Sequence, residues 1–171
     1  MRGNSIVLIG FMGTGKSTTG RVLARKTGLP CFETDEIVST QLGMSIPEIF
    51  ATLGEEKFRD SETEVLQQFS PENRAIIVTG AGIVLRPTNI QLLRALGRIV
   101  SLEADEETLF SRISKPELRP LLQTSNPRAT MVELLRRREL LYRAAADIRL
   151  DTSPFSLDEV ADTILTRIKT L

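Results

Sequence analysis

The segment 10–17, with the sequence GFMGTGKS, constrains this chain more than any other, because it fits the pattern G-x-x-x-x-G-K-[ST] of a phosphate-binding loop. It directly follows the apolar run 5–9, which is typical of a buried parallel strand, and a helical pattern begins near Lys16. A glycine-rich turn with a chance lysine would match the same pattern, but the strand before it and the helix after it favour a binding loop. In such a loop, backbone N–H groups and the positive end of the helix hold a triphosphate.

The side chains of this loop have separate expected roles. Lys16 would reach between the β- and γ-phosphates, and the Ser17 hydroxyl would ligate a Mg²⁺ ion that bridges the same oxygens. The sequence therefore predicts an ATP site that includes Gly13, Thr14, Gly15, Lys16, Ser17 and Thr18.

The composition predicts a single domain, residues 1–171, because this length and a hydrophobic content of 41% suffice for a sheet covered on both faces. Lys plus Arg and Asp plus Glu balance at 22 each, so no overall field favours nucleic acid or an anionic membrane as a partner. The chain has no histidine, so carboxylates must carry out any proton transfer.

The single cysteine, Cys31, excludes an internal disulfide and a cysteine-based metal cluster, and it fits a reducing compartment. The apolar run near the N-terminus is too short for a signal peptide or a membrane span, and Gly10 interrupts it. We therefore expect a soluble cytoplasmic protein, and the composition favours a monomer.

Short apolar runs alternate with longer amphipathic stretches, which predicts an α/β fold with a parallel sheet and helical crossovers. The expected strands are 5–9, 31–32, 75–78, 98–102 and 148–150. The expected helices are 16–27, 35–42, 46–69, 88–95, 106–113, 130–145 and 156–170. The stretch 46–69 is expected to break near Gly54. Residues 114–128 contain Pro116, Pro120 and Pro127 and are expected to form an exposed loop.

Further motifs follow the phosphate loop in order: FETD at 32–35, SIPEIF at 45–50, GEEKFR at 54–59, Glu62, TGAG at 79–82, RPLL at 119–122, and Arg138 before LY at 141–142. In this combination the chain resembles the shikimate kinases, of the nucleoside monophosphate kinase-like group of P-loop folds, over essentially its whole length. The resemblance implies a five-stranded parallel sheet in the order 2-3-1-4-5, helices on both faces and a mobile lid. It also implies transfer of the ATP γ-phosphate to the 3-hydroxyl of shikimate, a step of aromatic amino-acid biosynthesis that gives shikimate 3-phosphate and ADP.

The resemblance assigns an acceptor-binding region at about 33–62, together with later residues. Shikimate carries one carboxylate and three hydroxyls, so its pocket needs planar cations and hydrogen-bond acceptors. Arg59 and Arg138 match the family's carboxylate-binding arginines. Outside this motif context each would be read as a solvated helix arginine, and Arg138 has Arg136 and Arg137 beside it.

Asp35 corresponds to the family's substrate-binding aspartate, and in a chain without histidine it is the best candidate for the general base. It also suits a helix N-cap, a role compatible with the first. Glu62, three residues after Arg59, could orient that guanidinium as an i,i+3 pair. The resemblance also implies that the glycine-rich turn after the third strand passes close to shikimate and the transferred phosphate, although ordinary turns also use glycine. Its residues are Gly80, Ala81 and Gly82.

On the nucleotide side, Arg119 matches the family's lid arginine, within a lid at about 114–128, and Arg112 matches the residue that packs on adenine. An ordinary exposed loop with an arginine is the alternative for the lid. The segment 152–155, which includes Pro154, is positioned like the family's adenine-contacting loop.

Three positions depart from the family pattern. Glu33 stands where Asp is usual near the Mg²⁺ and its waters, and a longer carboxylate can still act through water. Ala81 stands where glycine is usual; a positive φ there would cost alanine roughly 1–2 kcal/mol, whereas a negative φ would cost little. Leu140 stands where proline is usual, and leucine is the better helix former.

Three functions are compatible with these motifs and departures. The leading hypothesis is an ATP-dependent, Mg²⁺-requiring shikimate kinase whose substrates are ATP and shikimate. A P-loop kinase for another small hydroxy acid, such as gluconate, would use the same carboxylate-binding arginines. A diverged module that binds nucleotide or shikimate but transfers phosphate poorly is the third alternative, and Glu33 and Ala81 motivate it.

Overall fold

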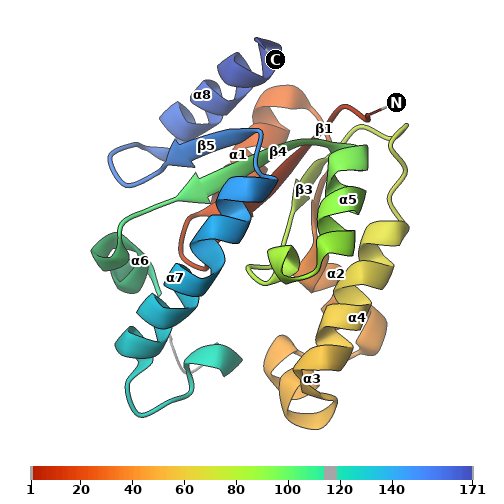
Figure 1. Ribbon diagram of the computed structural model, residues 1–171. Coiled ribbons are helices and arrows are strands. Elements are labelled where there is room, and N and C mark those ends of the chain that lie inside the picture. The colour runs from red at the N-terminus through yellow and green to blue at the C-terminus, as the bar shows by residue number, and fades with distance from the viewer. Residues whose placement is uncertain (1, 114–118, 171) are drawn as a thin grey trace.

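A five-stranded parallel sheet with the strand order β2-β3-β1-β4-β5 forms the centre of the computed structural model, which describes residues 2–113 and 119–170 (Figure 1). The predicted strand order and the all-parallel direction are therefore confirmed. The strands are β1 Ser5–Gly10, β2 Cys31–Glu33, β3 Ile76–Val78, β4 Gly97–Glu103 and β5 Ile148–Asp151.

The helices connect these strands and follow the sequence-based prediction closely. They are α1 Lys16–Thr27, α2 Thr34–Leu42, α3 Ile46–Thr52, α4 Gly54–Gln67, α5 Pro87–Leu96, α6 Glu106–Arg112, α7 Pro127–Ala145 and α8 Leu157–Lys169. The described residues also form the 3₁₀ turns η1 Ile83–Leu85 and η3 Pro120–Leu122. The predicted break near Gly54 is confirmed, because α3 ends at Thr52 and α4 begins at Gly54, which has a φ of 82°.

The predicted exposed loop 114–128 extends too far at its C-terminal end. Helix α7 begins at Pro127, where a proline costs little because the first helical N–H has no partner within the helix. The Asn126 side chain caps this helix by accepting from the backbone N–H of Ala129 at 3.1 Å. Leu122 is also buried rather than exposed, so this end of the segment is anchored in the core.

Alternate residues of β1 point to opposite faces of the sheet and are buried on both. Ile6 and Leu8 pack toward α1 and α8, whereas Val7 and Ile9 pack toward α5 and α7. Figure 1 shows these helix pairs on the two sides of the sheet. A continuous apolar run is therefore required here, as expected of a parallel strand covered on both faces.

A smaller apolar cluster joins α2, α3 and α4 outside the sheet. Its buried members are Val38, Ile49, Phe58 and Val65. This cluster supports α2 and α4 beside the C-terminal ends of β2 and β3, where ligands bind in open α/β sheets. Among the described helices, none is long and apolar enough to cross a membrane.

Candidate active site

The loop between β1 and α1 has the backbone conformation of a phosphate-binding loop. Gly10, Gly13 and Gly15 all have positive φ values, which a residue with a Cβ atom rarely adopts. Lys16 opens α1, and its ammonium donates to the carbonyl oxygens of Gly10 at 2.8 Å and Phe11 at 2.9 Å. Burial lowers the pKa of Lys16 to about 8, so its charge is held in a poorly solvated position.

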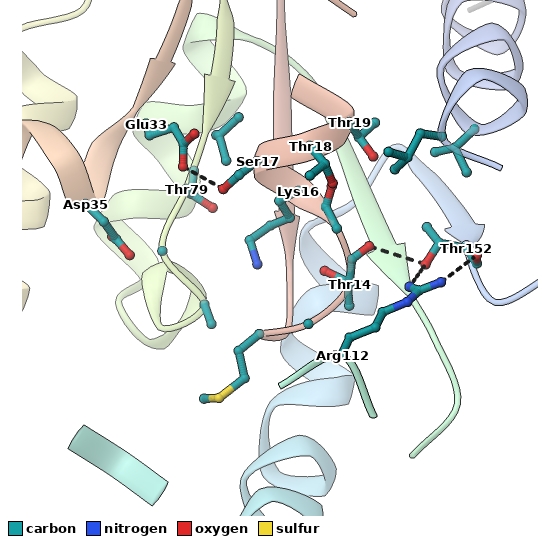
Figure 2. Close-up of a pocket in the computed structure, with 18 of the residues that line it drawn as sticks. Thr14, Lys16, Ser17, Thr18, Thr19, Glu33, Asp35, Thr79, Arg112 and Thr152 are labelled. Carbon is teal, nitrogen blue, oxygen red and sulfur yellow. Dashed lines mark hydrogen bonds between the residues drawn. The ribbon is translucent and has the colours of Figure 1, made fainter. Parts of the chain in front are cut away.

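This loop forms one wall of a cleft of about 620 Å³. Figure 2 shows Lys16 in the centre, with Glu33 and Asp35 on one side and Arg112 and Thr152 on the other. The cleft brings together most of the sequence-predicted site residues: Gly13, Thr14, Gly15, Lys16, Ser17, Thr18, Glu33, Asp35, Gly80, Ala81, Arg112 and Arg119.

Glu33 and Ser17 form a pair of hard oxygen donors beside the loop. The Ser17 hydroxyl donates to Glu33 Oε2 at 2.5 Å (Figure 2). Arg21 donates to the other carboxylate oxygen of Glu33 at 2.9 Å. Within the described residues, no group of three or more His, Cys, Asp or Glu side chains could by itself hold a metal. The Ser17 and Glu33 oxygens nevertheless suit Mg²⁺, which is often bound by few protein ligands, waters and phosphates.

The opposite end of the cleft is mainly apolar and is bounded by Arg112. Its guanidinium donates to the hydroxyl of Thr152 at 3.0 Å and to the carbonyl oxygen of Thr152 at 3.3 Å. Phe155 and Leu157 line this end, whereas Pro154 is not among the lining residues. The segment 152–155 therefore lies at the cleft, but the side chain that reaches the cleft is that of Phe155 rather than Pro154.

A second group of charged side chains lies beyond Asp35, around the turn after β3. Arg59 is only 6% exposed, and Glu62 and Arg138 are also buried. Arg59 donates to Glu62 at 2.7 Å and to Glu55 at 2.9 Å, so the predicted i,i+3 pair is present. The described structure gives no hydrogen-bond partner to three buried atoms here, Asp35 Oδ1, Glu62 Oε1 and Arg138 Nη1. Buried polar groups of this kind point to a polar ligand.

The two glycines of the turn are required by close approach. A Cβ atom at Gly80 would overlap the carboxylates of Asp35 and Glu62, and one at Gly82 would overlap the guanidinium of Arg59. Ala81, between them, does not have a positive φ, so the strain considered for alanine does not arise. The departure at Ala81 is therefore compatible with the turn.

Tyr142 is a site-supporting residue to which the sequence argument gave no role. Its hydroxyl donates to the carbonyl oxygen of Ala81 at 2.5 Å, and its ring is buried in the core next to the turn. Burial raises the pKa of Tyr142 to about 12, so it remains a neutral donor. Its position four residues after Arg138, on the same helix face, was the available signal.

The acidic groups of the site have perturbed proton affinities. Burial raises the pKa of Asp35 above its usual range, although Lys16 and Arg59 act in the opposite direction. Burial also raises the pKa of Glu62 to about 7, against the attraction of Arg59. Asp35 lines the cleft and Glu62 lies beside it across Gly80, and carboxylates with raised pKa values at such positions are typical of functional sites.

The structure also places the lid arginine and the exposed departure on α7. Arg119 lines the cleft next to η3, whereas residues 114–118 of the expected lid lie outside the described residues. Leu140 is 70% exposed on α7, which continues through it as an ordinary helix. Its departure from the family pattern therefore does not touch the site.

Comparisons with known proteins agree with this geometry. A family model described as shikimate kinase matches residues 12–169. A shikimate kinase of Moorella thermoacetica is 45% identical over 169 residues, which cover 99% of this chain and 96% of the relative. One of Thermodesulfovibrio yellowstonii is 43% identical over 161 residues, covering 94% and 92%. A solved shikimate kinase from Acinetobacter baumannii, in complex with shikimate, matches with a TM-score of 0.93 at 33% identity, covering 98% of this chain and 94% of that chain.

Proposed function

The chain belongs to the shikimate kinase family, and we propose that it transfers the γ-phosphate of ATP to the 3-hydroxyl of shikimate, giving shikimate 3-phosphate and ADP. One observation supports this function most directly. Asp35 lines the phosphate cleft and also lies against Gly80 beside Glu62, so it stands between a nucleotide site and a set of buried acceptor-binding groups.

In this proposal Arg59 and Arg138 bind the shikimate carboxylate. Both guanidinium groups are buried, and Arg138 Nη1 has no partner in the described structure. A desolvated, planar cation binds a carboxylate strongly and fixes its orientation. Glu62 holds Arg59 in place and accepts a hydrogen bond from a ring hydroxyl through its free oxygen.

Asp35 orients the 3-hydroxyl and takes its proton. As the hydroxyl oxygen bonds to the γ-phosphorus, the bond from that phosphorus to the bridging oxygen of ADP breaks, and the hydroxyl proton passes to the Asp35 carboxylate. Burial raises the pKa of this carboxyl, which brings its basicity closer to that of a useful general base.

Lys16 and the loop amides stabilise the charge on the transferred phosphoryl group. Because the Lys16 ammonium is poorly solvated, its attraction for a phosphate is weakly screened. Arg119 lies at the same cleft, and we infer that it closes over the phosphates as part of a lid and excludes water, which would otherwise accept the phosphoryl group.

Ser17 and Glu33 would hold Mg²⁺ together with the phosphates, Glu33 through water. When bound, the ion neutralises negative charge on the β- and γ-phosphate oxygens. Glu33 Oε2 accepts a hydrogen bond from Ser17, while its other oxygen accepts one from Arg21. The longer side chain of glutamate therefore still places a carboxylate oxygen beside Ser17.

At the other end of the cleft, Arg112 and Phe155 are the proposed contacts of the adenine ring. Thr152 holds the Arg112 guanidinium from two sides, which fixes its plane for stacking on a base. The Ser17–Glu33 hydrogen bond and the φ of Ala81, which is not positive, support an active kinase over a diverged module that transfers phosphate poorly.

A coupled assay of ADP release with Mg-ATP tests the function. Release should be stimulated strongly by shikimate and remain near the background rate with gluconate or with no acceptor. Equal or faster turnover with gluconate would assign the enzyme to another hydroxy acid. Nucleotide binding without any acceptor-stimulated release would instead favour a binding module.

A further inference from the structure

The turn that follows β3 is hydrogen-bonded to three different helices. The backbone N–H of Gly80 donates to the Thr34 hydroxyl of α2 at 3.3 Å, and the Tyr142 hydroxyl of α7 donates to the carbonyl oxygen of Ala81 at 2.5 Å. The Asn89 amide of α5 donates to the carbonyl oxygen of Ile83 at 3.3 Å. Hydrogen bonds therefore fix the turn at Gly80 and Ala81, and they fix η1, which directly follows it, at Ile83.

Two of these helices also carry proposed acceptor-binding side chains. Thr34 directly precedes Asp35, and Tyr142 lies one helical turn after Arg138. Each hydrogen bond to the turn thus fixes the helix close to the side chain that would touch the substrate.

Asn89 differs, because α5 carries none of the proposed substrate-binding residues. Asn89 is fully buried, and its Oδ1 accepts a hydrogen bond from the Thr63 hydroxyl of α4 at 2.8 Å. Thr63 follows Glu62, and the same hydroxyl lies 3.1 Å from the carbonyl oxygen of Arg59. One buried amide therefore joins the glycine-rich turn to the helix that carries Arg59 and Glu62.

The distance between this turn and α4 has little tolerance. Gly80 and Gly82 lie so close to the Glu62 carboxylate and the Arg59 guanidinium that neither has room for a Cβ atom. Any displacement of α4 from the turn would therefore move both charged groups relative to Asp35. A satisfied hydrogen-bond network in a buried position is well suited to prevent such a displacement.

A second connection between these segments lies at the surface. Arg86 forms ion pairs with Glu56 and Asp60 of α4, and it also donates to the Thr63 hydroxyl at 3.5 Å. Both carboxylates are largely exposed, and exposed ion pairs contribute little to holding two elements together. The buried connection through Asn89 is therefore the stronger candidate for fixing the spacing.

We propose that Asn89 is a positioning residue for the acceptor: with Thr63 it sets the distance between the glycine-rich turn and α4, and thereby the affinity for shikimate, without touching the substrate. This inference rests on the proposed function, in which Arg59 and Glu62 bind the acceptor.

Two substitutions test the proposal. Thr63→Val keeps the shape of the side chain but removes the hydroxyl, and it should raise the KM for shikimate roughly three- to tenfold. Asn89→Leu removes both hydrogen bonds and should raise it roughly ten- to a hundredfold. Neither should change the KM for ATP by more than about twofold, because the phosphate loop is not part of the network. If Asn89→Leu does not fold, Thr63→Val decides the question together with Arg86→Ala. The latter removes the Arg86 contacts to α4 but keeps the Asn89–Thr63 hydrogen bond, and it should leave the KM for shikimate within about twofold of the original value.

Matched variants separate positioning from stability. Thr63→Ser restores the hydroxyl and should bring the KM for shikimate back to within about twofold of the original value. Ser5→Ala removes a buried hydroxyl that bonds to Asn73 and Ala75 at the opposite end of the sheet, so it should lower the melting temperature without changing either KM. Added to Asn89→Leu, Thr63→Val should have no further effect on the KM for shikimate.

The proposal is overturned if Thr63→Val leaves the KM for shikimate unchanged, or if the KM for ATP rises in parallel. An unmodified enzyme without shikimate-stimulated turnover would refute the proposed function instead, and this is visible before any variant is compared. Calorimetric titration with shikimate would then still compare the acceptor affinities of the variants.

Discussion

The two sides of the cleft are built in different ways. On the nucleotide side, one continuous segment between β1 and α1 provides the glycine turn, the ammonium and the hydroxyl. On the acceptor side, the proposed groups come from α2, α4, α7 and the turn after β3, and they meet only because hydrogen bonds and an apolar cluster hold these elements together. We therefore expect substitutions to impair ATP binding only when they lie in or next to the loop between β1 and α1. Acceptor binding should also respond to substitutions at residues that never contact a substrate.

Lys16→Ala should have the largest effect, because it removes a poorly solvated cation from the phosphate side. We expect kcat to fall by about 10²- to 10³-fold, as measured by ADP release at saturating substrates. Lys26→Ala is the control, since Lys26 lies in the last turn of the same helix and pairs with Asp158 and Asp162. A kcat close to that of the unmodified enzyme would mean that Lys16 does not contact the transferred phosphate.

Arg59→Ala should give the next largest effect, and on the other substrate. It removes a buried cation and leaves Glu62 buried without its partner, so kcat/KM for shikimate should fall by an amount equivalent to roughly 2–4 kcal/mol. Lys57→Ala, on the same helix but exposed, should change it little. A loss confined to ATP affinity would place Arg59 on the nucleotide side and contradict the comparison above.

The pH dependence should distinguish the two sides more finely. Because burial raises the pKa of Glu62 to about 7, the ionised fraction of its carboxylate falls as the pH drops below that value, and kcat/KM for shikimate should fall by up to about tenfold per pH unit. In contrast, Lys16 has a lowered pKa of about 8, so its charge is lost at higher pH and the KM for ATP should rise there. Glu62→Gln should remove the acid limb near pH 7, and an unchanged limb would assign it to another group.

Ala81→Gly should have the smallest effect. The φ of Ala81 is not positive and its carbonyl, rather than its methyl group, is engaged by Tyr142, so kcat/KM should stay within about twofold. Gly82→Ala is the matched opposite, because its Cβ would overlap Arg59, and it should raise the KM for shikimate about tenfold. A large gain of activity in Ala81→Gly would show that the methyl group crowds the acceptor.

Local sequence patterns were sufficient to predict the loop between β1 and α1 and the order of the elements. A strand, a glycine-rich turn and a helix are local structures, and their residues follow one another in the chain, so periodicity and motif spacing were sufficient. Local patterns also predicted the break at Gly54. The strand order, in contrast, followed from the family resemblance.

The assembly of the proposed acceptor side, in contrast, depends on tertiary contacts. The closeness of Gly82 to Arg59, the hydrogen bond from Tyr142 to Ala81 and the buried position of Asn89 join residues that are far apart in the chain. The placement of Phe155 rather than Pro154 at the cleft, and the φ of Ala81, likewise depend on how loops pack against neighbouring elements. Local sequence does not specify such contacts, because they arise when separate helices and turns are fixed against one sheet edge.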